Sequence, residues 1–153
     1  MSRGFLAASV LFLAGLAGVL ALFPRRAAAK AAAPAAAPEM SGRVARGKYL
    51  VEGVAMCGEC HTPRDANGAL DESRDLQGAP IWIVPVRPRP DWAHRAPALA
   101  GLEAFTDEQA ETVLEKGVGP NGLPLQAPMH DYRMSPEDAK AIVAYLRSLP
   151  PPR

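Results

Sequence analysis

The chain has 153 residues, of which 48% are hydrophobic and 6% aromatic, and it carries 17 Lys and Arg against 16 Asp and Glu. This length suits one small domain, and the low aromatic content predicts a thin core, which a cofactor, metal or crosslink often completes. The near-neutral charge argues against a nucleic-acid-binding protein, because such a protein must neutralise phosphates with a basic surface. Two cysteines are too few for a disulfide scaffold.

The N-terminal segment is long enough to cross a membrane. Residues 4–23 are twenty consecutive positions without a charge. That length can span a bilayer, whereas the apolar region of a cleaved signal peptide is usually about 7 to 15 residues. We therefore expect residues 1–26 to form a membrane anchor, with a cleaved signal segment as the alternative. Arg25, Arg26 and Lys30 put more positive charge after this segment than before it, so the positive-inside rule alone would keep the domain in the cytoplasm.

Residues 27–40 are rich in Ala and Pro and predict a tether, which leaves residues 41–153 as the folded domain. The first 38 residues contain 14 Ala, so the overall hydrophobic fraction overstates the core of the domain. Without these 38 residues the chain has 13 basic and 16 acidic side chains, a net charge of −3. The domain has no internal repeat, so we expect a single site.

A first helix is predicted over residues 43–56. Four residues recur there on one helical face: Gly47, Leu50, Val51 and Val54. Gly47 has no side chain and would let a partner helix approach closely.

Two more helices are predicted towards the C-terminus. Thr106 and Gln109 predict a capping box at the start of the second helix, which ends near Gly117. Ser135 followed by Pro136 predicts the start of the third helix. Its buried stripe is expected at Ala139, Ile142, Val143 and Leu146.

Residues 62–105 are rich in Pro and show no sustained helical period. We expect irregular chain there, with a short helix near Pro97 to Leu102. A loop of this length in an all-α domain needs something inside the fold to wrap around.

The motif that carries chemistry is Cys57-Gly58-Glu59-Cys60-His61. The C-x-x-C-H spacing is typical of covalent haem attachment, since each thiol can bond a vinyl group of one porphyrin while the adjacent His61 faces the iron. A zinc site would have to recruit two of His61, His94 and His130, which lack finger-like spacing. A thioredoxin-like motif needs a preceding strand, and a disulfide would close an unusually small loop. The motif favours one haem c over these three alternatives.

Several motifs resemble the class I cytochrome c family. They are Gly47-x-Tyr49, Cys57-x-x-Cys60-His61, Pro128-Met129 and Ala144-Tyr145-Leu146-x-Ser148-Leu149. Four phrases are similar to mono-haem domains in the cytochrome subunits of periplasmic dehydrogenases: CHTPR, LQGAPI, APALAGL and APMHDY. The resemblance covers about residues 41–150. It implies an all-α, class I cytochrome c fold, with three or more helices around one covalently bound haem, a long irregular loop, and first and last helices that cross.

The second axial ligand of the iron is expected from elsewhere in the chain. The candidates are Met129, Met134, Met56, His94 and His130. Met56 is too close in sequence to the attachment site to reach the opposite face of the ring, and Met134 fits the position before the Ser135 cap, where it would pack on its own helix. The resemblance implies Met129, which matches the distal Met of the family. His61 and Met129 would then ligate the iron, and ligation by two histidines is the alternative.

Other side chains near the motif have two interpretations each. The second ring nitrogen of His61 is expected to donate to a backbone carbonyl, for which Pro80 is the candidate. Trp82 and Trp92 would pack either on the porphyrin or in an ordinary core. Four arginines would either pair with the propionates or be solvated: Arg64, Arg87, Arg89 and Arg95.

With both axial positions filled, the iron has no open site, so the resemblance implies an electron carrier without a small-molecule substrate. The expected partners are redox proteins, namely a periplasmic dehydrogenase or quinol-oxidising complex and an oxidase or another cytochrome. The family's haem is attached outside the cytoplasm, which implies the periplasmic side of the membrane, with residues 1–26 as the anchor. The alternative class is a haem enzyme, or a gas or peroxide sensor, whose distal ligand leaves easily.

Overall fold

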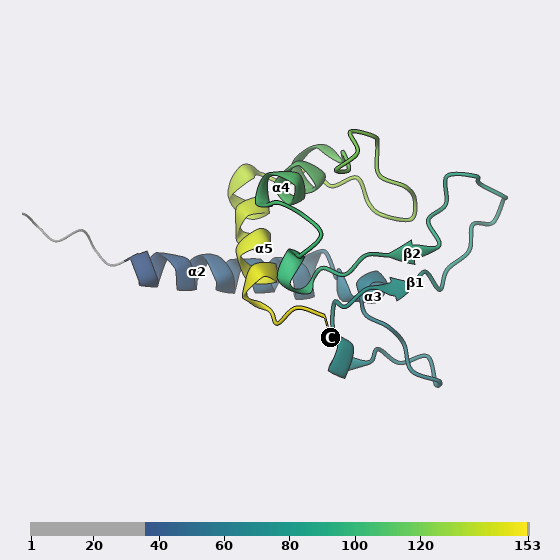
Figure 1. Ribbon diagram of the computed structural model, residues 1–153, viewed down its shortest axis with the longest axis horizontal. Coiled ribbons are helices and arrows are strands. Elements are labelled where there is room, and N and C mark those ends of the chain that lie inside the picture. The colour runs from purple at the N-terminus through teal and green to yellow at the C-terminus, as the bar shows by residue number, and fades with distance from the viewer. Residues whose placement is uncertain (1–35, 153) are drawn as a thin grey trace, which may run out of the picture. The chain divides into compact units, whose positions relative to one another are not determined.

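The computed structural model describes residues 36–152, so the expected anchor, residues 1–26, and the greater part of the expected tether lie outside the described residues. The described part is mostly helical, as the sequence predicts (Figure 1). Its elements are α2 (Ala36–Tyr49), η1 (Leu50–Val54), α3 (Gly58–His61), η2 (Glu72–Arg74), β1 (Ala79–Pro80), β2 (Arg95–Ala96), η3 (Ala100–Leu102), α4 (Asp107–Lys116) and α5 (Pro136–Ser148). Within residues 36–152, no helix is both long enough and apolar enough to cross a membrane.

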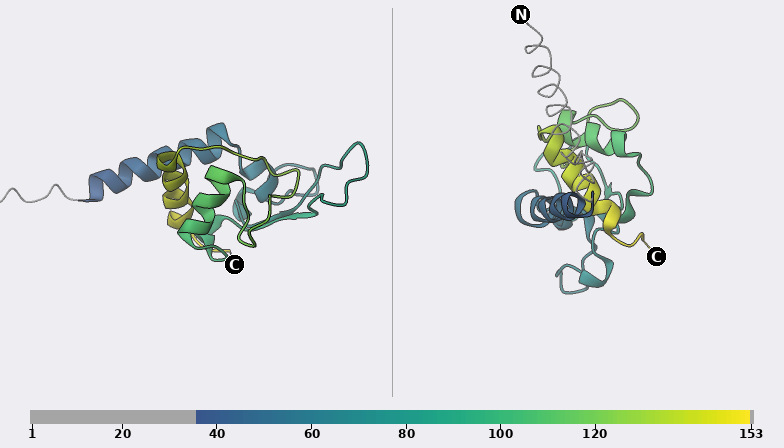
Figure 2. Two further views of the ribbon diagram at one scale, coloured as in Figure 1. Left: turned by 90° about the horizontal axis from the view of Figure 1, so that it is seen from above. Right: turned by 90° about the vertical axis from the view of Figure 1, so that its left-hand side faces the viewer.

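The frame of the domain is the crossing of α2 with α5, which Figures 1 and 2 show from different sides. Gly47 is buried at this crossing. A methyl group on Gly47 would overlap the carbonyl oxygen of Ala141 and would lie 2.7 Å from Cβ of Tyr145. The missing side chain therefore allows the close approach that the sequence predicts.

The first helix differs from its predicted range, residues 43–56, at both ends. α2 begins at Ala36, so the last residues of the expected tether are helical. At its C-terminal end α2 passes into the π-helical turn η1, where the Ala55 N–H donates to the Leu50 carbonyl at 2.8 Å. A π turn inserts an extra residue into the helix and rotates the chain that follows. Leu50 and Val51 are buried as expected, but Val54 is 51% exposed, so its predicted place on the buried face is wrong.

α4 begins and ends, and α5 begins, where their local signals predict. The Thr106 hydroxyl accepts from the Gln109 N–H at 3.2 Å, and the Gln109 side chain accepts from the Thr106 N–H at 2.9 Å. Gly117 ends α4 with a left-handed φ of 67°. The Ser135 hydroxyl caps α5 by accepting from the Asp138 N–H at 3.2 Å.

The core lies where α4 and α5 pack together and against the α2–η1 segment. All four residues of the predicted stripe of α5 are buried in it: Ala139, Ile142, Val143 and Leu146. Other elements contribute Leu50, Val51, Leu76, Leu102 and Leu114. Cys57 packs against the same cluster, so the core directly supports the C-x-x-C-H motif.

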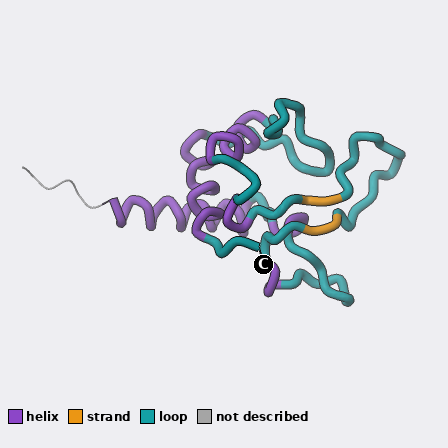
Figure 3. Tube along the Cα trace, in the orientation of Figure 1, coloured by secondary structure: helices purple, strands orange, loops and turns teal. Residues whose placement is uncertain are grey.

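Residues 62–105 are largely irregular, as expected, and Figure 3 shows loops over much of this end of the domain. The short helix expected near Pro97 to Leu102 is η3. Strands β1 and β2 are not predicted by the sequence pattern; they pair antiparallel, with Ala79 opposite Ala96. This two-residue ladder closes a hairpin whose loop, residues 81–94, projects away from the helices (Figure 1).

Candidate functional site

Cys57, Cys60 and His61 lie on one short helical turn, α3 and its N-cap. The Cys57 N–H donates to the Val51 carbonyl at 3.0 Å, which attaches the turn to η1. The His61 N–H donates to the Cys57 carbonyl at 3.0 Å. Positions three and four apart on a helix share a face, so both thiols and the imidazole lie on one side of the turn. The two thiols are free and half-buried, so the disulfide alternative is not realised.

His61 is buried, and one hydrogen bond fixes its ring. Nδ1 donates to the carbonyl oxygen of Pro97 at 2.8 Å. Because a carbonyl can only accept, the proton is on Nδ1, and Nε2 is left unprotonated, with a lone pair available to a metal. Burial lowers the pKa of His61, and the Pro97 carbonyl opposes this effect less strongly. The neutral imidazole that results is the form that binds a metal.

The prediction that Pro80 supplies this carbonyl is wrong. Pro80 lies in β1 opposite Arg95, whereas Pro97 follows β2 and reaches the imidazole. The β1 side of the hairpin contacts His61 through its main chain instead, because the Gly78 N–H donates to the His61 carbonyl at 2.8 Å. The two sides of the hairpin therefore hold His61 together, one by its ring and the other by its backbone.

Thr62 is a residue of the site that sequence reasoning missed. Its hydroxyl is buried, donates to the Asp75 carboxylate at 2.6 Å and accepts from the Leu76 N–H at 2.9 Å. These bonds fix the two ends of the loop between α3 and β1 against each other. The one signal for this role is the position of Thr62 directly after the motif, in the phrase CHTPR.

The loop that carries Met129 is attached to the rest of the site at two points. The Ala93 N–H donates to the Ala127 carbonyl at 2.7 Å, and the Tyr132 hydroxyl donates to the Ala55 carbonyl at 3.1 Å. These bonds hold the half-buried Met129 near the imidazole. Burial raises the pKa of Tyr132, and the two thiols of the motif raise it further, since the phenol lies close to both.

The other candidates for the second ligand have different surroundings. Met134 packs against the hydrophobic core at the start of α5, as its position before the cap predicts. Met56 is 58% exposed and has a left-handed φ of 48° beside the attachment turn. His94 is exposed, and the exposed His130 contacts Tyr132 edge-on, with ring centres 5.7 Å apart.

The zinc and thioredoxin-like alternatives find no support within residues 36–152. In that range, no group of three or more His, Cys, Asp or Glu side chains is placed to hold a metal ion. The turn α3 follows a helical segment, and the two short strands that the structure describes pair antiparallel. The βαβ context that a thioredoxin-like motif needs is therefore missing from these residues.

Arg64 and Trp82 pack on each other and both contact Glu59 of α3. Arg64 pairs with the Glu59 carboxylate at 2.7 Å, and its guanidinium carbon lies 4.6 Å from the centre of the Trp82 ring. The Trp82 Nε1–H donates to the Glu59 carbonyl at 3.1 Å. Trp82 is 59% exposed, so ordinary core packing does not describe it. Among the other arginines, Arg89 pairs with Asp91 at 2.6 Å.

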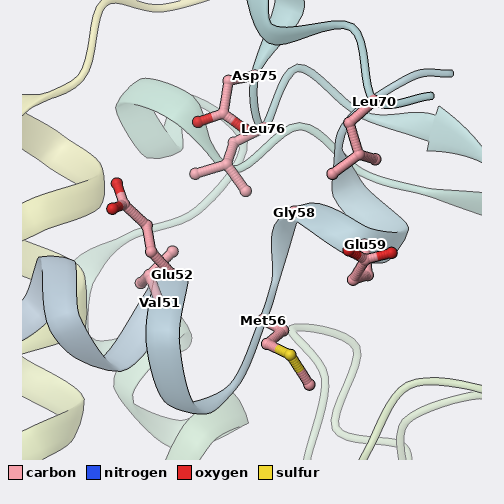
Figure 4. Close-up of a pocket in the computed structure, with 8 residues that line it drawn as sticks. All are labelled: Val51, Glu52, Met56, Gly58, Glu59, Leu70, Asp75 and Leu76. Carbon is pink, nitrogen blue, oxygen red and sulfur yellow. The ribbon is translucent and has the colours of Figure 1, made fainter. Parts of the chain in front are cut away.

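A pocket of about 240 Å³ also lies beside α3, and Figure 4 shows its lining. It is lined by Val51, Glu52, Met56, Gly58, Glu59, Leu70, Asp75 and Leu76. Neither a thiol nor the imidazole takes part, and Glu59 is on the opposite face of the turn from them. Its three carboxylates have protein partners: Lys48 and Tyr145 for Glu52, Arg64 for Glu59 and Thr62 for Asp75. The pocket is therefore separate from the C-x-x-C-H site.

Two free thiols on one turn, a neutral imidazole fixed at Nδ1 and a helical frame fit one covalently bound haem c. This combination defines a c-type haem domain. The model of the cytochrome c family matches residues 44–150, which is most of the chain. The chain belongs to the cytochrome c family, as the sequence motifs predict.

Its relatives are larger cytochrome proteins. The chain is 37% identical over 112 residues to a diheme cytochrome c-type protein of Cereibacter sphaeroides, covering 69% of this chain and 35% of that protein. It is 37% identical over 112 residues to the fructose dehydrogenase cytochrome subunit of Gluconobacter japonicus. This match covers 69% of this chain and 22% of that subunit. It is 32% identical over 125 residues to the cytochrome c subunit of a quinone alcohol dehydrogenase of Gluconacetobacter polyoxogenes. This match covers 75% of this chain and 26% of that subunit. The chain thus spans about a third or less of each relative.

Proposed function

We propose that this cytochrome c carries single electrons from a periplasmic dehydrogenase or quinol-oxidising complex to a terminal oxidase or another cytochrome. The observation that carries the proposal is the buried His61, whose Nδ1–H bond to Pro97 keeps Nε2 for the iron beside two free thiols. The haem supplies a reversible one-electron change at iron when it is bound. Two of the relatives are cytochrome subunits of sugar and alcohol dehydrogenases, which supports a dehydrogenase as the donor.

In this proposal Met129 would be the second protein ligand of the haem iron. Its loop is joined to the hairpin by the Ala93–Ala127 hydrogen bond and to the segment before the motif by the Tyr132 hydroxyl. These attachments favour a fixed thioether over a mobile one. A protein ligand on both sides of the iron leaves no site for a substrate, and a thioether raises the reduction potential relative to a second imidazole.

Membership of the family implies the extracytoplasmic side of the membrane for the domain, and we propose residues 1–26 as its anchor. The basic residues after this segment do not prevent export, because a long translocated domain is largely independent of a short flanking charge. A periplasmic reporter fused after Arg153 should be active, and a cytoplasmic reporter should be silent. An anchored chain should leave the membrane with detergent but not with salt; release by salt would indicate that the segment is cleaved.

The electron-carrier function is tested by the absorption spectrum of the purified protein. A low-spin ferrous spectrum, a far-red charge-transfer band in the ferric state and no binding of carbon monoxide are expected. A high-spin spectrum with ready binding of carbon monoxide would instead indicate the haem enzyme or gas sensor that the sequence left as the alternative. Reduction by a quinol-oxidising or dehydrogenase fraction then tests the donor.

A further inference from the structure

The loop of the β1–β2 hairpin, residues 81–94, presents an apolar face to solvent. Exposure alternates strictly along its first strand-like stretch, with Ile81, Ile83 and Pro85 half-buried. The residues between them face outward, and Trp82 is 59%, Val84 83% and Val86 103% exposed. In a stretch with this alternation the solvent side is ordinarily polar, so three apolar side chains there indicate a surface that is covered in use.

This loop is also basic within an acidic domain. Together with the adjoining Arg95 of β2, the loop contains three Arg and one Asp, whereas the rest of residues 39–153 carries 10 basic and 15 acidic side chains. Arg89 pairs with Asp91. Among the described residues, no hydrogen bond or ion pair joins the side chain of Arg87 or Arg95 to another side chain. The loop therefore offers unpaired positive charge beside exposed apolar side chains.

Both tryptophans of the chain are in this loop. The Trp92 Nε1–H donates to the Ile83 carbonyl at 3.3 Å, across the loop, and prolines at positions 85, 88 and 90 restrict its backbone. Tryptophan is enriched at membrane–water interfaces, and arginine is attracted to anionic lipid headgroups. The loop therefore combines, on one stiff projection, the side chains that an interfacial segment uses.

We propose that the 81–94 loop docks on an anionic bilayer surface and orients the haem domain against it. This inference rests on the proposed membrane anchor, which ends ten residues before Ala36. At about 3.5 Å per extended residue, those residues hold the start of the domain within about 35 Å of the membrane. An anionic surface attracts the loop and repels the rest of the domain, whose charge is negative, so the loop is the part of the domain that faces the lipid.

The attachment of the loop to the haem site gives this orientation a consequence for function. Trp82 bonds the Glu59 carbonyl on the C-x-x-C-H turn, and Ala93 bonds Ala127 on the loop that carries Met129. A bilayer contact through the tip of the loop therefore brings both sides of the haem site close to the membrane surface. The partner favoured by this placement is a redox protein embedded in the same membrane.

The test uses the full-length, haem-loaded protein in vesicles of phosphatidylethanolamine and phosphatidylglycerol, with phosphatidylcholine vesicles for comparison. A Val86→Cys variant carries a nitroxide, since the two native cysteines are blocked by the haem. A Lys140→Cys variant, at an exposed position of α5, is the matched control. In the diamagnetic ferrous state, the label at position 86 should lose collisions with an aqueous nickel chelate several-fold on anionic vesicles only. The label at position 140 should not change.

Two further double variants test whether the arginines cause the docking and whether the apolar face is independent of the haem. Arg87→Glu with Arg95→Glu, added to the labelled Val86→Cys protein, should restore the collisions with the nickel chelate. Val84→Ser with Val86→Ser should leave the haem absorption unchanged; an altered spectrum would show that this face belongs to the haem and would overturn the proposal. A label at position 86 that stays accessible on both vesicles also overturns it, and would assign the face to a protein partner.

Different outcomes contradict the anchor proposal and the loop proposal. If the chain remains in the vesicles after a salt wash while the label at position 86 is in water, the loop proposal is wrong and the anchor stands. If the label is shielded on anionic vesicles but salt releases the chain, the anchor is wrong and the loop contact stands.

Discussion

The ring of His61 is held by a residue 36 positions further along the chain, through the 2.8 Å bond from Nδ1 to the Pro97 carbonyl. The motif predicts the imidazole and its role, because the thiols and the histidine are adjacent in sequence. It does not predict the acceptor, since any backbone carbonyl has the same chemistry whatever side chain it belongs to. The same reason explains why Thr62 was missed: its partners at positions 75 and 76 come from the fold.

The assignment of Met129 predicts opposite behaviour for two neighbouring methionines. Met129→His should keep a six-coordinate iron but lower the reduction potential, because an imidazole stabilises the ferric state more than a thioether does. Met129→Ala should open a site that binds carbon monoxide. Met134→Leu should do neither and should cost at most about 1.5 kcal/mol of stability, the limit for a volume-conserving swap in a core.

The measurement is the far-red charge-transfer absorption of the ferric protein in each variant. It should vanish in Met129→Ala and persist in Met134→Leu. The opposite pattern would transfer the ligand role to Met134.

The contact of Glu52 with Tyr145 predicts a dependence of stability on pH. The Glu52 carboxylate accepts from Lys48 Nζ and from the Tyr145 hydroxyl, each at 2.5 Å, and these two bonds lower its pKa from the ordinary value of 4.5. A lowered pKa in the folded state means that this contribution to stability is present above pH 4.5 and is lost as the pH falls through the folded pKa. Burial and the bond to Glu52 raise the pKa of Tyr145 above its ordinary value of 10, so its contribution is lost in the alkaline range above that value.

Glu52→Gln should therefore flatten the acid limb of the stability curve. The Glu52 side chain is 44% exposed, so solvent screening keeps the effect below about 1 kcal/mol. Urea unfolding midpoints between neutral pH and about pH 3 measure it. Glu72→Gln, a change of an exposed carboxylate outside this contact, is the control; equal slopes in the two variants would contradict the prediction.

At the scale of the elements, the helices differ in how well the sequence predicts them. The ends of α4 and α5 are set by Thr106, Gly117 and Ser135, each within a few residues of the helix end that it caps. Local chemistry is enough to place such ends. The π turn η1 carries no comparable signal, and it rotates Val54 out of the face that a regular helix would give it.

The sequence fails to predict the β1–β2 hairpin for a different reason. Its ladder is two residues long, and one of them is Pro80, so neither alternation nor β-propensity marks it. The pairing instead depends on contacts with the site, such as the bond from Gly78 to the His61 carbonyl. Tertiary context of this kind cannot be read from a local pattern.

The crossing of α2 and α5 predicts a large difference between two glycines of the same helix. Gly47→Ala would place a methyl group against the Ala141 carbonyl and Tyr145, and should destabilise the domain by about 1–3 kcal/mol or more, as overpacking does. Gly42 is exposed, and a methyl group there has no atom within 4 Å. Gly42→Ala should therefore stabilise α2 by up to about 1 kcal/mol.

Thermal or urea unfolding of the two glycine variants, both haem-loaded, checks this difference. Similar stabilities for Gly47→Ala and Gly42→Ala would mean that the helices are not in contact at Gly47.

At the scale of the whole molecule, a haem bound at this site would connect regions that lie far apart in the sequence. The core of α4, α5 and the α2–η1 segment supports Cys57, while the hairpin holds His61 and the loop after Ala127 carries Met129. The composition indicates this dependence, since a small domain with few aromatic side chains needs an internal group to complete it. Position in the membrane and choice of redox partner involve other molecules, so the motifs of this chain leave them open.

Covalent attachment of the haem is tested most directly by whether haem remains on the polypeptide after denaturing electrophoresis. Two thioether bonds, from Cys57 and Cys60, should keep one haem on the wild-type chain, with haem stain and protein stain in the same band. Cys57→Ala with Cys60→Ala should remove the haem stain while the protein band persists. Loss of haem from the denatured wild-type chain, or normal covalent loading of the double variant, would contradict the assignment of this motif as the haem attachment site.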